Sequence, residues 1–204
     1  VVSIIFTWPL LAHINKAVPQ GSEPPAVAYF QLFTVQWTSM AMQVPHRYWD
    51  APFFYPFKGS FAWSEPQLFT ALVVSLLAKL AGFIISYNIV VLLYMVLMGL
   101  SAYVGARMLT KDATAALWSG IWMCAGAYSL QQICAPALLA AWSVFFLILF
   151  SFLSLIKKNR IYCVPAFLFY IIAWLTCKQL ALMATLFLPF CLWPWIFSLS
   201  DQYQ

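Results

Sequence analysis

The sequence predicts an all-α integral membrane protein with about six transmembrane helices and a long first external loop that contains two membrane-surface helices. Three observations predict this fold. Hydrophobic residues make up 65% of the chain and charged residues only 7%, whereas about a quarter of the residues of a soluble domain are charged. The apolar runs have the length of helices and are separated by short polar breaks. Lys and Arg residues concentrate in two short segments, 107–111 and 157–160.

The first apolar run, residues 1–14, is predicted to be a transmembrane helix that lacks its start. The chain opens on Val1 inside this run and closes on residues 200–204 without an evident end, so we expect an incomplete protein. A cleaved signal peptide is the competing interpretation, but no basic segment and no small-residue cleavage pattern accompany the run. The prolines from Pro19 to Pro25 then end the helix and begin the external segment, 15–85.

A first surface helix is expected over residues 27–43. Its Gln, Ser and Thr residues make it a poor bilayer span. On a helix, however, Phe30, Phe33, Trp37 and Met40 fall on one side, which suits a helix that lies along the membrane surface.

A second surface helix is expected over residues 65–82. Ser64 and Gln67 have the spacing of a capping box, and Pro66 fits the first turn, so the helix should begin at Glu65. The Glu65 carboxylate would then lie at the positive end of its own helix, which favours its ionised form. We therefore expect a charged ligand or orienting group, or simply a stabilising first-turn acid, and not an acid that stores a proton.

The basic segments decide whether the helix over 65–82 crosses the bilayer. If it lies at the surface, segments 107–111 and 157–160 both fall on the side opposite to the long loop, as the positive-inside rule requires. This arrangement predicts a multi-pass membrane protein whose first loop is external. The bundle covers 86–198 within one transmembrane domain, 1–204. The expected spans are residues 1–14, 86–106, 113–129, 136–156, 161–177 and 180–198.

Several small and aromatic residues are expected to have structural roles. Gly99 and the residues 101–106 would allow close helix packing. Trp193 and Trp195 suit an interfacial belt at the end of the last span, and the rings of 53–55 suit the headgroup region. The five cysteines show no C-x-x-C spacing and are interpreted mainly as buried small hydrophobic residues.

The residues that carry chemistry lie mainly in the external segment. The sequence has no phosphate-binding glycine loop, no H-E-x-x-H and no nucleophile elbow, so we expect no metal and no other cofactor. Acidic and basic residues stand instead among many aromatic residues, which suits a lipid-phosphate substrate and not a nucleic acid. The candidate acids are Glu23, Asp50 and Glu65, and the candidate bases are Arg47, Lys58 and Lys178.

The order of several short motifs resembles the GT-C superfamily of membrane glycosyltransferases, and more closely a broad bacterial group of multispanning relatives. The resemblance covers roughly residues 7–150, and the order of the motifs carries it. The motifs are T-W-P-L at 7–10, Y-W-D-A-P-F-F-Y-P at 48–56, S-E-P-Q-L at 64–68, Y-N at 87–88, and G-L-S-A-Y-V-G-A-R-M-L-T at 99–110 followed by A-A-L-W-S-G.

The resemblance implies a multi-pass protein of the bacterial inner (plasma) membrane, with its first loop on the periplasmic or external side. It also implies transfer of a sugar from a polyprenyl-phosphate donor to an acceptor on the external face. It places Glu23 where such proteins carry an Asp soon after the first span, as the group that deprotonates or orients the acceptor hydroxyl. Glu65 matches the acid before the family's proline, and it or Asp50 would assist. The three acids should then converge in one cavity, and Arg47, Lys58 or Lys178 would contact the departing phosphate.

A non-catalytic subunit of a larger membrane assembly is the second hypothesis. Glu23 replaces the Asp of the family, and the chain has fewer spans than the full enzymes. An uncharged aromatic face would then pack against other membrane subunits instead of serving catalysis. We expect this face to contain Trp142, Phe145, Phe146 and Phe150. A small transporter is a third interpretation, supported by the helical content alone.

Overall fold

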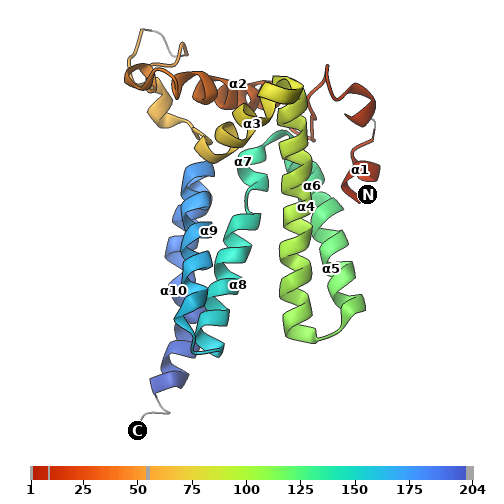
Figure 1. Ribbon diagram of the computed structural model, residues 1–204, viewed down its shortest axis with the longest axis vertical. Coiled ribbons are helices and arrows are strands. Elements are labelled where there is room, and N and C mark those ends of the chain that lie inside the picture. The colour runs from red at the N-terminus through yellow and green to blue at the C-terminus, as the bar shows by residue number, and fades with distance from the viewer. Residues whose placement is uncertain (1, 9, 54–55, 201–204) are drawn as a thin grey trace.

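The computed structural model describes residues 2–8, 10–53 and 56–200, and these residues form helices and no strand. One set of helices runs side by side, and α2 (Pro25–Ala41) and α3 (Leu68–Ala81) lie across one end of that set (Figure 1). The predicted all-α class is therefore confirmed for the described residues. The helices that run side by side are α4 (Phe83–Thr110), α5 (Ala113–Ala125), α8 (Trp142–Ile156), α9 (Cys163–Thr176) and α10 (Lys178–Ser200).

The chain reverses direction at each connection between these helices (Figure 1). From the end covered by α2 and α3, α4 runs away and α5 returns; α8 runs away, α9 returns and α10 runs away. Segments 107–111 and 157–160 therefore lie at the end opposite to α2. Between α5 and α8 stand the short helices α6 (Ala127–Gln131), η4 (Gln132–Cys134) and α7 (Pro136–Leu139).

Two helical stretches in the described part of the chain are long and apolar enough to cross a membrane. They are Phe83–Thr110 and Pro136–Ile156, and the second joins α7 and α8. Leu68–Ala81 and Arg160–Thr176 are apolar but shorter. By length and composition, the two long stretches indicate membrane association.

The first apolar run differs from the prediction of one helix over 1–14. It forms a short helix, α1 (Val2–Phe6), and a separate 3₁₀ turn, η1 (Leu10–His13). The Thr7 hydroxyl donates to the Ser3 carbonyl over 2.8 Å, which closes the end of α1. A proline follows at position 9 of the sequence, and proline lacks the amide donor and disfavours helical geometry in the residue before it.

The start of α3 is also not where the capping pattern placed it. The helix begins at Leu68, because Gln67 has a φ of 50°, which is incompatible with a right-handed helix. The buried Ser64 hydroxyl makes no hydrogen bond, so the predicted capping box does not form. Glu65 consequently lies before the helix and not in its first turn.

The aromatic side of α2 packs largely on its own loop. The ring centroid of Phe53 lies 5.8 Å from that of Phe33 and 6.0 Å from that of Phe30, and Phe33 stacks on Trp37. The loop therefore covers part of the side predicted to face the membrane, because its rings need apolar partners, and Met40 stays exposed. Residues 54 and 55 of this loop lie outside the described residues.

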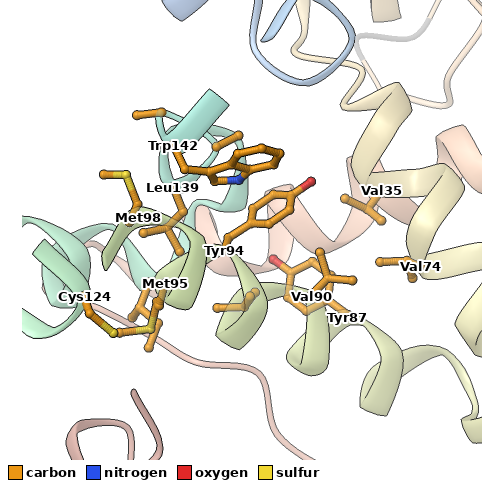
Figure 2. Packing of buried hydrophobic residues seen from close by; sticks show 14 of the residues in the cluster. Val35, Val74, Tyr87, Val90, Tyr94, Met95, Met98, Cys124, Leu139 and Trp142 are labelled. Carbon is orange, nitrogen blue, oxygen red and sulfur yellow. The ribbon is translucent and has the colours of Figure 1, made fainter. Parts of the chain in front are cut away.

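The hydrophobic core lies where α2 and α3 meet α4, α7 and α8. Figure 2 shows Val35 and Val74, from α2 and α3, facing the α4 side chains, and Tyr94 beside Trp142. Trp142 and Phe146 are buried, and Phe146 and Phe150 both stack on Phe169 of α9. The aromatic face predicted to meet partner subunits is therefore mostly internal, with Phe145 as its exposed member.

The predicted close packing at Gly99 is confirmed. A Cβ atom on Gly99 would lie 2.7 Å from the Gly120 carbonyl oxygen, so α4 and α5 touch through their backbones at this point.

Three cysteines, Cys124, Cys134 and Cys177, are buried free thiols, whereas Cys163 is exposed at the start of α9. The side chains of Cys191, Trp193 and Trp195 lie outside the described part of the structure.

Candidate functional site

A cavity of about 490 Å³ lies beside the N-terminal segment. Trp8, His13 and Gln20 contribute to its wall, and Leu130 and Ile133 close it from the α6–η4 region. Trp8 is 67% exposed, so its aromatic ring is accessible to a ligand at this cavity. Its volume falls in the range of small-molecule sites, roughly 300–1,000 Å³.

The wall of this cavity is held by α4 and α6. Asn88 of α4 is fully buried, and its side-chain amide donates to the carbonyls of Ile14 (2.8 Å) and Ala17 (2.7 Å). Gly21 lies so close to α6 that a Cβ atom there would be 2.2 Å from the Gln131 carbonyl oxygen. Residues 14–21 are thus fixed between two helices. Asn88 is an amide in an apolar run, and this sequence signal alone could have marked it as a site residue.

Glu23 is the predicted acid nearest to the cavity in the chain. It is half-buried and stands between Gly21 of the cavity wall and the start of α2. The Gln20 amide, itself in the wall, donates to the Glu23 carbonyl over 3.4 Å. Among the described residues, no hydrogen bond engages the Glu23 carboxylate.

Glu65 and Lys178 lie together, although they are far apart in the sequence. The Glu65 carboxylate accepts a hydrogen bond of 2.8 Å from the Lys178 main-chain amide, at the first residue of α10. The predicted interaction with a helix N-terminus therefore exists, but with α10 and not with its own helix. The Lys178 ammonium group lies 3.5 Å from the Ala62 carbonyl, so this cation stays beside the loop that precedes α3.

Asp50, Arg47 and Lys58 share one exposed loop. The Asp50 carboxylate accepts from the Gly59 amide (2.9 Å), and the Asp50 amide donates to the Arg47 carbonyl (3.0 Å). Gly59 has a φ of 69°, a conformation in which glycine is favoured. The Asp50 side chain therefore closes a turn by its hydrogen bond to Gly59. Lys58 is the residue before this glycine in the chain.

The three predicted acids do not form one cluster. Glu23 precedes the first residue of α2, whereas Asp50 follows its last residue, and a helix of 17 residues is about 25 Å long. Glu65 lies apart from both, at the start of α10. The structure thus leaves Glu23 two residues along the chain from the cavity wall, Glu65 with Lys178, and Asp50 in one loop with Arg47 and Lys58.

A buried polar network joins α2 to the start of α3. The fully buried Gln67 donates to Gln31 and to the Thr34 hydroxyl (3.0 Å), and the Thr38 hydroxyl donates to the Pro66 carbonyl (2.6 Å). The Trp37 indole donates to the Tyr48 carbonyl over 3.0 Å, and burial raises the pKa of the Tyr48 phenol above its usual value. These contacts hold α2, α3 and their connection as one rigid cap.

No family model, no curated protein and no solved structure matches this chain. Within the described residues, no three His, Cys, Asp or Glu residues are grouped so that they could hold a metal ion.

Proposed function

We propose that the protein is a multispanning membrane glycosyltransferase of the GT-C type, which uses a polyprenyl-phosphate sugar on the external face. In this proposal α4, α5, α8, α9 and α10 cross the membrane, and α2 and α3 lie at its external surface. The clustering of segments 107–111 and 157–160 at the opposite end supports this orientation. The first segment, which is not one continuous helix, leads into the external end.

The observation that carries the proposal is the cavity lined by Gln20 and Gly21, since Glu23 follows two residues after Gly21 in the chain. Sugar rings expose apolar C–H faces that pack on aromatic rings, and Phe6 and Trp8 supply such rings at the cavity. A carboxylate within reach of the acceptor hydroxyl then serves as general base. Because its carboxylate is not engaged by described residues, Glu23 fits this role better than Glu65 or Asp50, which both accept structural hydrogen bonds.

The proposal is tested by replacing Glu23 and measuring sugar transfer. Membranes containing the protein are given undecaprenyl phosphate carrying a labelled hexose or labelled aminoarabinose. Glu23→Gln should lower transfer by about 10²–10⁴-fold, because the amide cannot accept the proton. Asp50→Asn, in the exposed loop, is the matched control and should transfer normally. Normal transfer by Glu23→Gln, or no transfer by the unaltered protein from any of these donors, would contradict the proposal.

A non-catalytic subunit remains the second candidate, because one other aromatic face is exposed. Trp118 and Trp122 are 67% and 75% exposed and stand one turn apart on α5. A partner helix bound there would be lost from the purified complex when both tryptophans are replaced by alanine. Purification as a single species that binds undecaprenyl phosphate would favour the enzyme.

A further inference from the structure

A second cavity, of about 550 Å³, is a groove between α8, α9 and α10. Leu147, Ser151 and Leu155 line it from one face of α8, and Phe167 and Leu188 line it from α9 and α10. These three helices lie side by side (Figure 1). The groove is distinct from the cavity beside Glu23, because the two share no lining residue.

The hydroxyl groups of this groove are paired within the chain. The Ser151 hydroxyl donates to the Leu147 carbonyl (2.7 Å), and the hydroxyls of Tyr170 and Thr185 lie 2.8 Å apart in a hydrogen bond. Their polarity is therefore satisfied locally, and the remaining wall is aliphatic and aromatic. Such a wall suits a hydrocarbon chain better than a polar ligand.

The groove begins at a basic turn. Leu155 and Cys163, which both line it, flank the turn between α8 and α9. Lys157 and Arg160 stand in this turn and are exposed. A ligand in the groove would thus meet positive charge at one end and apolar side chains along the rest.

The length of the groove matches one leaflet of a bilayer. Leu147 and Leu155 lie about 12 Å apart along the α8 axis. The hydrocarbon of one leaflet is about 15 Å deep, half of the bilayer core. A lipid whose headgroup lies at the basic turn would therefore place an acyl chain along the groove.

We propose that the groove holds an acyl chain of one anionic phospholipid of the cytoplasmic leaflet, whose phosphate is bound by Lys157 and Arg160. The proposal rests on the membrane placement proposed above and does not depend on sugar transfer. Charge complementarity selects an anionic lipid over a zwitterionic one, because exposed Lys and Arg residues at the membrane surface attract anionic headgroups.

Native mass spectrometry of the full chain tests this site. The protein is purified with equal amounts of phosphatidylglycerol and phosphatidylcholine that carry the same acyl chains. One phosphatidylglycerol should be retained in preference. Replacing two cations, in K157Q/R160Q, should weaken its binding about 25-fold, at about five-fold for each charge. Ser151→Phe should also remove the lipid while both cations remain, because the new ring fills the groove.

The matched control is R107Q/K111Q, which removes two charges from the other turn at the same end. Arg107 donates to the Lys111 carbonyl, and neither residue lines the groove, so phosphatidylglycerol binding should be unchanged. Equal retention of the two phospholipids, or equal loss in both double variants, would overturn the proposal. Displacement of phosphatidylglycerol by undecaprenyl phosphate would also overturn it and assign the groove to the donor. Equal retention or equal loss leaves the transfer assay of Glu23→Gln unaffected, so the two proposals fail separately.

Discussion

At the scale of single residues, a buried amide and a half-buried carboxylate join parts of the chain that are distant in sequence. Asn88 holds two carbonyls of the N-terminal segment, and Glu65 holds the first amide of α10. Asn88 satisfies two carbonyls that lie outside the helices. Glu65 satisfies the first amide of α10, because the first amides of a helix lack partners within it. Their loss should therefore be felt as a loss of stability.

Replacing Asn88 by leucine should lower the free energy of unfolding by about 1–3 kcal/mol, because the Ile14 and Ala17 carbonyls lose their donor. The released segment should also be cut faster by trypsin after Lys16. Ser86→Ala is the control, because the Ser86 hydroxyl donates only within its own helix region, to Gly82. Thermal unfolding in detergent and timed proteolysis measure both effects, and unchanged cleavage of Asn88→Leu would refute the role of this amide.

Replacing Glu65 by alanine should lower the free energy of unfolding by about 1 kcal/mol, the usual effect of losing a helix cap. Glu65→Gln should lose less, because the amide oxygen still accepts from Lys178. Thermal unfolding and the sugar-transfer assay are measured on the same samples. A Glu65→Gln protein of normal stability that transfers no sugar would show that Glu65 is catalytic and that the cap is incidental.

At the scale of elements, backbone contact decides how closely the long helices approach. α4 and α5 meet at Gly99 and Gly120, where the carbonyl oxygen of each residue occupies the space of a side chain on the other. Farther along α4, a Cβ atom placed on Gly105 would meet no atom within 4 Å. Two glycines of one helix therefore have opposite packing requirements.

Gly99→Ala should destabilise the protein by roughly 1–3 kcal/mol, because its Cβ atom would lie 2.7 Å from backbone and force the helices apart. Gly105→Ala, on the same helix, should be neutral or stabilising by about 0.5–1 kcal/mol, since alanine restricts the unfolded chain more than glycine does. Thermal unfolding of the two variants side by side is the measurement. Equal stability would mean that α4 and α5 separate at no cost.

At the scale of the whole molecule, the two ends of the long helices differ in architecture. The cap of α2 and α3 covers one end of the long helices, and the two basic turns stand at the other (Figure 1). This separation supports the proposed orientation, because basic turns remain on the cytoplasmic side. The cavity beside the N-terminal segment is lined from the region of α6 and η4, and the groove between α8, α9 and α10 begins at the basic end.

The orientation predicts which introduced cysteines react with a membrane-impermeant maleimide in intact cells. With the exposed Cys163 replaced by serine, Lys58→Cys should be labelled in intact bacterial cells. Lys111→Cys should be labelled only after the membrane is permeabilised. Both positions are exposed, so accessibility to reagent differs only through the membrane. Labelling of Lys111→Cys in intact cells would reverse the proposed orientation.

The sequence by itself determined the helical class and the positions of the long apolar helices. The runs predicted over 86–106 and 136–156 lie within the two stretches of spanning length, because a continuous apolar run satisfies its own backbone only as a helix. The close approach at Gly99 also followed from the sequence, since small side chains alone permit it.

Only the tertiary structure decided the start of α3, the partner of Glu65, the inward packing of Trp142 and the separation of Glu23 from Asp50. Local patterns such as the spacing of Ser64 and Gln67 describe one segment, whereas each of these features depends on a second segment. Glu65 and Lys178 are brought together because the chain reverses direction at the connections between the long helices. No local propensity encodes that contact. For such residues the burial and pairing of polar groups across the fold outweigh the preference of the segment itself.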